Sequence, residues 1–232
     1  MDNIINPFDF SQVMNNTNKC NFNNEPDCIN NNQVQLDMYK QLSERFSLLP
    51  VHSKNKVAAI KKWPNRCFNK VPFNINDYKD QNGNTRNAGI ACGPASGVIV
   101  LDIDNVNQFN EWCHKAGLSN PIPDTFTVQS GGKSQHYYFK YPDDGKEYHK
   151  REISGAKLIG IGGYVAAPSS IHKSGKSYIV INDCPIAAAA PWMLDIMCKK
   201  ISKNKNNVQI NLEMFLPAPV ITPAAYNIEK GV

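Results

Sequence analysis

The amino-acid sequence predicts an α/β or α+β domain, because segments typical of strands and of helices alternate along the chain without a strict repeat. Short apolar runs at 87–91 and 97–103 indicate two buried strands. Apolar residues recur at near-helical spacing over about 34–46, which indicates a helix. The 232 residues suffice for one sizeable core, or for one domain with tails.

The remaining elements follow from the same patterns of apolar periodicity and turn residues. The expected elements after the first helix are, in order, a strand at 47–51, strands at 87–91 and 97–103 joined by a Gly-Pro turn at 93–94, a helix over 107–116, strands at 125–128 and 136–141, a strand pair at 158–161 and 164–167 around Gly162 and Gly163, a strand at 178–181, and a helix over 191–200.

Composition divides the chain into three parts. Half of the residues in 15–32 are asparagine, and such a segment buries little apolar surface. We therefore expect a poorly ordered, Asn-rich segment over 1–33 and a folded domain over 34–200. The Lys/Asn-rich and then Pro-containing stretch over 201–232 predicts a tail, or a linker toward a following domain.

Several classes of protein are disfavoured by composition. No apolar run reaches the roughly 18–20 residues that a membrane helix needs. Residues 1–10 contain the acidic Asp2 and no basic residue before an apolar run, which argues against a secretory signal. The seven cysteines are odd in number and form no C-x-x-C pair, which argues against a disulfide framework or a zinc ribbon. We expect a cytoplasmic protein without a membrane partner, with reduced cysteines. The formal net charge of +5 permits a polyanionic partner without requiring one.

Two aspartates follow the most apolar strand. Four apolar residues, 98–101, precede Asp102 and Asp104, and alternation along a strand places both carboxylates on one face. Adjacent carboxylates repel one another and remain ionised at low cost only near a cation or in water. Mg²⁺ and Mn²⁺, which prefer hard oxygen ligands, are the natural partners. The alternative is a solvated strand end, which the preceding apolar run and the following helix disfavour.

A glycine turn before the strand at 136–141 is a candidate nucleotide site. Its candidate residues are Ser130, Gly131, Gly132, Lys133, Ser134 and His136. The two glycines let the backbone approach a phosphate closely, Lys133 supplies charge, and His136 could donate to a triphosphate oxygen. Alternatively, the glycines form only a hairpin turn and the histidine is packed at the start of a strand.

Two further segments carry polar or basic groups. Beyond Gly162 and Gly163, the residues Ser169 and His172 follow Pro168 at a strand end and are further candidates for nucleotide binding, although a structural hairpin is the favoured interpretation of this segment. Upstream, a basic and aromatic segment offers cations to track a template backbone and a ring for stacking, or else is a solvated basic loop. Its candidate residues are Lys61, Lys62, Trp63 and Arg66.

These motifs, in this order, resemble the archaeo-eukaryotic primase superfamily, and most closely the primase-polymerase domain at the N-terminus of many plasmid and phage replication proteins. The matching residues are Asp102-Ile103-Asp104, Ser134-Gln135-His136 and the segment 162–169, and the resemblance extends over about 34–181. It implies an RNA-recognition-like antiparallel sheet with flanking helices, beside a second α/β subdomain. It also implies a prokaryotic, plasmid or phage setting, and a helicase domain often follows in the same polypeptide.

The resemblance implies template-directed nucleotidyl transfer with two metal ions, Mg²⁺ or Mn²⁺, held by Asp102 and Asp104. The implied substrates are nucleoside or deoxynucleoside triphosphates, on a single-stranded or primed DNA template. His136, with Ser134 and the Gly131–Lys133 backbone, would bind the phosphates of the incoming nucleotide.

One position departs from the family pattern. Where the family has a third carboxylate, before the Gly162–Gly163 pair, this chain has Lys157. Three readings stay open: Glu152 supplies the missing ligand, the site holds one metal with the nucleotide, or catalysis is impaired. Two other functional classes also remain: a nucleotide- or nucleic-acid-binding module without chemistry, and a metal-dependent nuclease with His136 as general base.

Overall fold

A computed structural model describes residues 31–53 and 56–198 of the chain. The predicted tail over 201–232 and all but the last three residues of the predicted segment over 1–33 lie outside these ranges, as do Cys20 and Cys28. Within them, no helix is both long and apolar enough to span a bilayer. The five cysteines in the described ranges are free thiols.

Short strands, three α-helices and two short 3-10 helices make up the described chain. The elements are α2 (Asn31–Arg45), β1 (Leu48–Val51), the 3-10 helices η1 (Trp63–Cys67) and η2 (Ile75–Tyr78), β2 (Asn87–Ala91), β3 (Val98–Ile103), α3 (Val106–Lys115), β4 (Thr127–Gln129), β5 (Gln135–Lys140), β6 (Arg151–Ile153), β7 (Ala156–Ile159), β8 (Tyr164–Ala166), β9 (Ile179–Asn182), β10 (Ala187–Ala188) and α4 (Pro191–Cys198).

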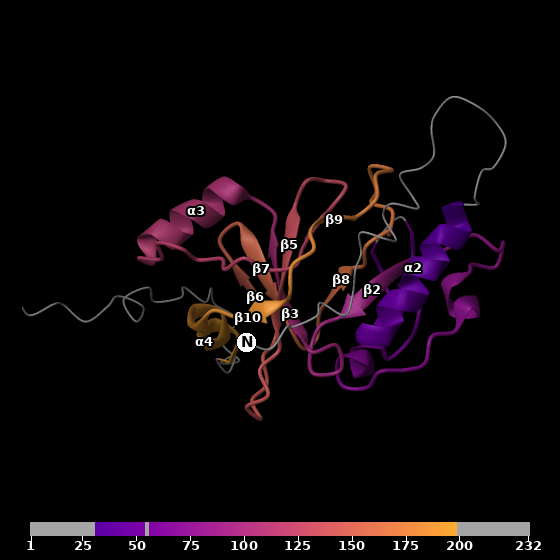
Figure 1. Cartoon of the computed structure of the whole chain (residues 1–232), viewed down its shortest axis with the longest axis horizontal. Coiled ribbons are helices and arrows are strands. Elements are labelled where there is room, and N and C mark those ends of the chain that lie inside the picture. Colours follow the sequence, from indigo (N-terminus) through magenta and orange to yellow (C-terminus); the bar gives the residue numbers. More distant parts are fainter. Residues whose placement is uncertain (1–30, 54–55, 199–232) are drawn as a thin grey trace, which may run out of the picture.

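The strands form two sheets. The larger has the order β6-β7-β3-β5-β4-β9, and β10 joins it beside β5. The smaller has the order β1-β2-β8. Every pairing is antiparallel except that of β10 with β5. Helices α3 and α4 lie on one side of the larger sheet, and the smaller sheet and α2 lie on the other (Figure 1). The predicted α+β class with an antiparallel sheet is confirmed.

Strand β3 lies inside the larger sheet and separates two cores. Its side chains alternate, so Val98 and Val100 pack toward the smaller sheet and α2, whereas Ile99, Leu101 and Ile103 pack toward α3 and α4. All five side chains are buried. This two-sided burial explains why the sequence of β3 is continuously apolar instead of alternating.

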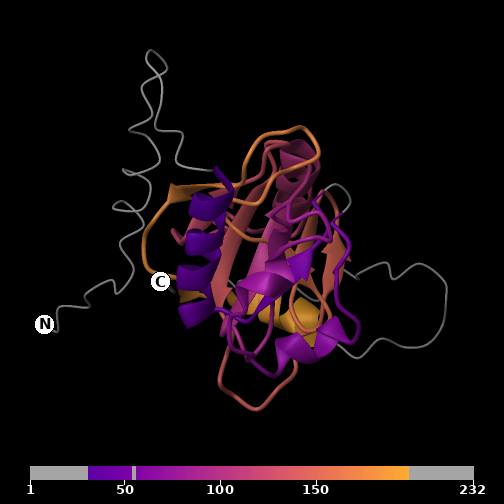
Figure 2. The same ribbon diagram turned by 90° about the vertical axis from the view of Figure 1, so that its right-hand side faces the viewer.

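Helix α2 covers the smaller sheet, and Figure 2 shows it along its length. Tyr39, Leu42 and Phe46 recur on one helical face and are buried against the strands. The Tyr39 hydroxyl lies 2.6 Å from the Gln35 amide nitrogen, which donates to it, and 3.1 Å from the Ser170 hydroxyl. The helix thereby holds the segment that follows β8, which reaches the functional site described below.

The prediction that the strands on either side of Gly162 and Gly163 pair with each other is wrong. Strand β7 pairs with β3 and β6 in the larger sheet, whereas β8 pairs with β2 in the smaller one. Gly162, with φ of 81°, lets the chain cross between the sheets, and a side chain on Gly163 would approach that of Ile159 within 2.6 Å. The glycines therefore form a crossing between sheets instead of a hairpin.

Strands β6 and β10 are absent from the sequence prediction. Strand β6 forms a tight hairpin with β7 at Ser154-Gly155, where Gly155 has φ of 73°. A Ser-Gly pair between Ile153 and Ala156 is a hairpin signal that the sequence contained. The two residues of β10 are too few to carry a strand pattern, and they join the sheet only through their pairing with β5. The predicted helix over 191–200 is observed as α4 over Pro191–Cys198, and its last two predicted residues lie outside the described ranges.

Candidate active site

Strand β3 delivers both predicted carboxylates to one cavity. Asp102 and Asp104 continue the face that begins with Val98 and Val100, because side chains alternate along the strand. Beyond the apolar core this face opens into a cavity of about 760 Å³, lined by residues of both sheets. The aspartates therefore stand where the core between the sheets ends and a solvent-accessible cavity begins.

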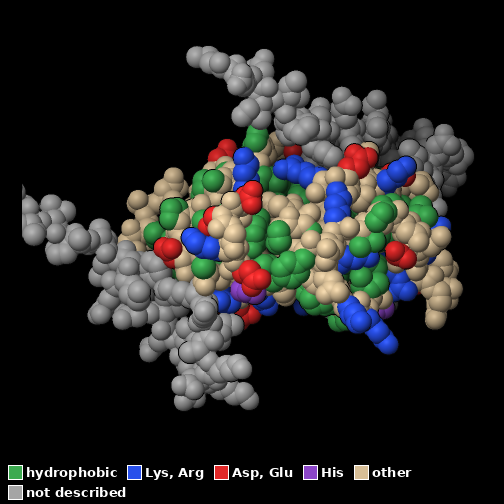
Figure 3. All heavy atoms as spheres, turned by 90° about the horizontal axis from the view of Figure 1, so that it is seen from below, with side chains coloured by type: hydrophobic (Ala, Val, Ile, Leu, Met, Phe, Trp, Pro, Cys, Tyr) green, Lys and Arg blue, Asp and Glu red, His purple; other side chains and the backbone are tan. Residues whose placement is uncertain are grey.

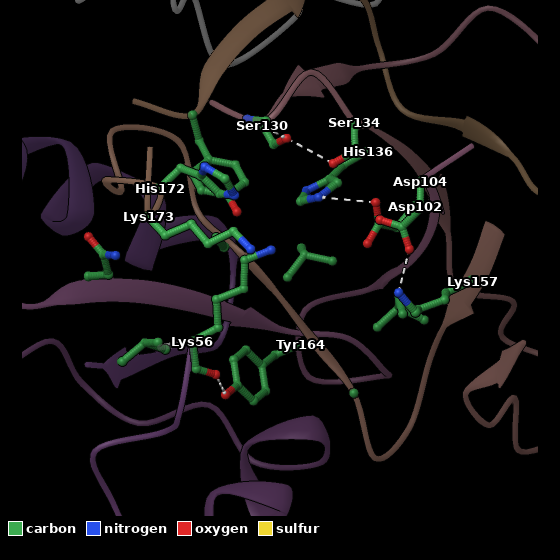
Figure 4. A pocket seen from close by; sticks show the side chains of 18 of the residues that line it. Lys56, Asp102, Asp104, Ser130, Ser134, His136, Lys157, Tyr164, His172 and Lys173 are labelled. Atoms are coloured by element: carbon green, nitrogen blue, oxygen red, sulfur yellow. Dashed lines mark hydrogen bonds and ion pairs between the residues drawn. The ribbon is translucent and has the colours of Figure 1, made fainter. Parts of the chain in front are cut away.

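A row of ionisable side chains crosses the larger sheet at Asp102. Strand register places Glu152 opposite Lys157, Lys157 opposite Asp102, and Asp102 opposite His136. Directly opposed residues point to the same face of a sheet, so all four share the face of Asp104. The Lys157 ammonium donates a hydrogen bond to Oδ2 of Asp104, as Figure 4 shows.

Asp102 is the more buried of the two aspartates. Burial, with a further contribution from the neighbouring Asp104 carboxylate, raises the pKa of Asp102 to about 6. Its Oδ1 atom is buried and has no hydrogen-bond partner among the described residues. A buried carboxylate oxygen without a partner is costly, so this atom is well placed to accept a cation.

His136 lies beside Asp102 in its neutral form. Its Nε2 atom is 3.5 Å from Oδ1 of Asp102, and burial, aided by the Lys56 ammonium, lowers the pKa of His136 to about 3. Within the described ranges, its Nδ1 atom is buried without a hydrogen-bond partner. The imidazole is 5.6 Å from the ring of Tyr178, centroid to centroid. His136 is thus a fixed, uncharged polar group at the floor of the cavity.

The turn from β4 to β5 closes on itself through its serines. The hydroxyls of Ser130 and Ser134 are 2.8 Å apart, and Gly132 donates its backbone N–H to the Ser130 hydroxyl at 3.2 Å. A side chain on Gly131 would lie 2.6 Å from the Lys176 carbonyl oxygen, so only glycine fits there. Ser130, Gly132 and Ser134 line the cavity together with His136. The Lys133 side chain is exposed and does not line it.

The loop after β8 packs against this turn. Ser174 donates its backbone N–H to Nδ1 of His172 at 3.2 Å, and its hydroxyl donates to the Gly131 carbonyl at 3.1 Å. Because Nδ1 of His172 accepts a hydrogen bond, the ring proton belongs on Nε2, which is free to donate. His172 lines the cavity, whereas Ser169 instead offers its carbonyl to the side chain of Gln35 at 2.9 Å.

The cavity carries a positive excess that the sequence did not locate. Four lysines line it, against the two aspartates: Lys56, Lys150, Lys157 and Lys173. The neutral His136 adds no charge. Elsewhere on the surface, the face seen in Figure 3 intersperses acidic and basic side chains. The four lysines come from separate parts of the chain, so no local motif announces their convergence on a polyanion-binding cavity.

The basic and aromatic segment over 61–66, part of which forms η1, brings one of its candidate residues to the cavity. Trp63 lines the cavity and packs edge-on against Tyr164, with ring centroids 4.8 Å apart. The Tyr164 hydroxyl donates to the Lys56 carbonyl, which fixes the Lys56 backbone at the cavity mouth. Lys61, Lys62 and Arg66 do not line the cavity, and the side chains of Lys61 and Lys62 are exposed.

The side chains at this site match the needs of one divalent cation. Asp102 and Asp104 offer hard oxygen donors, and Mg²⁺ in proteins is commonly held by one or two carboxylates together with substrate phosphates. Among residues 31–53 and 56–198, no group of three or more histidine, cysteine, aspartate or glutamate side chains could hold a metal ion. The Lys157 ammonium already bonds to Asp104, so a second divalent cation would have to compete with it for that carboxylate. No third carboxylate lines the cavity among the described residues.

Comparison with known proteins agrees with this geometry. The chain matches the family model described as bifunctional DNA primase/polymerase, N-terminal, over residues 40–192, which is more than half of its length. That range contains every residue of the cavity described above. No curated protein matches the chain. Primases and polymerases of this kind join nucleotides and generally depend on metal ions. The chain belongs to the Prim-Pol family of bifunctional DNA primase/polymerase N-terminal domains.

Proposed function

We propose that the cavity transfers nucleotides from nucleoside triphosphates to a growing strand on a DNA template. The observation that carries the proposal is the pair of carboxylates, Asp102 and Asp104, on the floor of a lysine-lined cavity beside a glycine turn. A carboxylate pair suits a divalent cation, and the surrounding positive charge suits a triphosphate. A Mg²⁺ or Mn²⁺ ion bound there would activate the attacking hydroxyl and neutralise charge on the phosphates.

The protein groups divide the remaining work. His136, Ser130 and Ser134 would position the phosphates, and the Gly132 backbone allows the close approach that such contacts need. His172 would donate from Nε2, and the Lys56 ammonium, which extends toward His172 and Lys173, would supply charge (Figure 4). The wall formed by Trp63 and Tyr164 would provide ring surface for a base. The exposed Lys61 and Lys62, with Arg66, remain candidates for the template backbone.

Two alternatives have their own signatures. The ion pair of Lys157 with Asp104 favours a binding module without turnover, because it neutralises one of the two candidate ligands. A nuclease with His136 as general base is disfavoured, because a group with a pKa of about 3 is a weak base near neutral pH.

Primer extension on a single-stranded template with Mg²⁺ or Mn²⁺ tests the proposal. The parent chain should extend the primer, and Asp102→Ala and Asp104→Ala should each abolish extension. Asp195→Ala is the matched control, because Asp195 is an exposed aspartate on α4, on the other side of the larger sheet. Nucleotide binding without extension would indicate a binding module, and shortened primers would indicate a nuclease.

A further inference from the structure

Lys157 holds a position in the sheet beside the two aspartates. It lies on β7 directly opposite Asp102, and its ammonium donates to Asp104. Both partners are partly exposed, with side-chain exposures of 37% for Lys157 and 48% for Asp104. A lysine side chain that is partly exposed and paired with a carboxylate is protonated at neutral pH, so Lys157 places a cation at the cavity floor.

This cation changes how many metal ions the floor can accept. The two aspartates carry two negative charges, and the ammonium balances one of them through a direct contact with Asp104. One divalent ion at Asp102 and Asp104 is then compatible with the remaining charge, helped by the phosphates of a bound nucleotide. A second divalent ion near Asp104 would be placed against the ammonium, and the two positive charges repel one another strongly at such separations.

Glu152 does not restore a second metal position. It faces the same side of the sheet, but Lys157 lies between it and Asp102 in the strand register. Its side chain is 68% exposed, and its Oε1 atom is 3.5 Å from the Lys150 ammonium. Glu152 is thus separated from the aspartates by one lysine and engaged with another.

We propose that the Lys157 ammonium is a built-in cation that takes the place of a second divalent ion, so that the cavity binds one divalent ion together with a nucleoside triphosphate. The proposal deepens the proposed function and rests on it for the identity of the nucleotide. Lys157 acts as a positioning residue: it fixes Asp104 and supplies one positive charge beside the carboxylate pair without being lost when metal is scarce.

Counting bound Mn²⁺ tests this directly. The signal of free Mn²⁺ in electron paramagnetic resonance would be titrated with the full chain in the presence of a saturating, non-hydrolysable deoxynucleoside triphosphate. Ion bound to the nucleotide in a protein-free titration is measured separately. The parent chain should bind one ion per chain within the complex, and Lys157→Asp should bind two. Lys157→Met should still bind one, but at least tenfold more tightly in the absence of nucleotide, because the competing ammonium is gone.

Lys173→Asp is the matched control. It makes the same charge change in the same cavity, but Lys173 lies on the loop beside His172 and makes no ion pair with Asp104. It should leave the count at one. Two ions bound by the parent chain, or a second ion gained equally by Lys173→Asp, would overturn the proposal. Binding counts of one and two, without primer extension by parent or Lys157→Asp, would instead contradict the proposed function and leave this inference standing.

Discussion

Lys157 and Asp102 face each other across neighbouring strands of the larger sheet, yet the lysine bonds to Asp104, two residues farther along. Asp102 keeps a buried carboxylate oxygen that has no hydrogen-bond partner among the described residues. The two aspartates of one strand thus have different states: one is neutralised by a lysine, and the other is left for a ligand.

Asp102 should be a destabilising residue when no metal is bound. Its folded-state pKa of about 6 lies above the ordinary value of 3.8, so the folded chain binds a proton more tightly than the unfolded chain. The stabilisation that the protonated Asp102 contributes is therefore fully present below about pH 4 and is lost as the pH rises through about 6. In the absence of metal, Asp102→Asn should raise the free energy of unfolding by about 2 kcal/mol at pH 7.5, and by little at pH 4.

Urea unfolding at the two pH values, with a metal chelator present, measures this difference. Asp195→Asn serves as the exposed control and should change stability by less than about 0.5 kcal/mol at both. An Asp102→Asn variant that is less stable than the parent at pH 7.5 would show that the carboxylate is already satisfied by the protein.

Lys56 should contribute more to nucleotide binding than the nearby Lys61. It lines the cavity, whereas Lys61 does not. Lys56→Ala should raise the KM for the nucleotide roughly tenfold, the loss expected for one charge-assisted contact. Lys61→Ala should leave that KM within about twofold, because its side chain is exposed outside the cavity. Steady-state primer extension at varied nucleotide concentration measures both KM values. Equal effects of the two substitutions would contradict the role of Lys56 in binding the phosphates.

The turn at Gly131 should tolerate no side chain. A Cβ atom there would lie 2.6 Å from the Lys176 carbonyl and 2.8 Å from Cβ of His172, so the turn must move away from the loop. Gly131→Ala should cost about 1–2 kcal/mol of stability and weaken nucleotide binding, because His172 and the turn would separate. Lys133→Ala, two residues along on an exposed side chain, should change neither property measurably. Thermal unfolding and nucleotide titration provide both readouts, and an unaffected Gly131→Ala variant would refute the packing argument.

The elements that could be predicted from sequence are those with strong local patterns. The unbroken apolar run of β3 identified a strand buried on both faces, and simple alternation placed Asp102 and Asp104 on one side of it. The spacing of Tyr39, Leu42 and Phe46 similarly identified α2. In these cases burial by distant parts of the chain agrees with the local pattern.

Long-range pairing accounts for what could not be predicted. The pattern of apolar residues on either side of Gly162 and Gly163 suits a hairpin as well as a crossing between sheets, and only the partners of β7 and β8 decide between them. The cavity lysines share the same difficulty: Lys56 and Lys150 are ordinary surface residues by local sequence. The pairing of Lys157 with Asp104 also needs the register of β3 and β7, which no local signal supplies.

Transfer of label from an α-labelled deoxynucleoside triphosphate to a primed template, with pyrophosphate measured in the same reaction, tests the central claim most directly. The parent chain with Mn²⁺ should incorporate label and release one pyrophosphate for each nucleotide added. Asp104→Asn should lose both signals, and Asp195→Asn should keep both. Stable nucleotide binding by the parent chain without label in the DNA and without pyrophosphate would contradict the account and identify a binding site that performs no transfer.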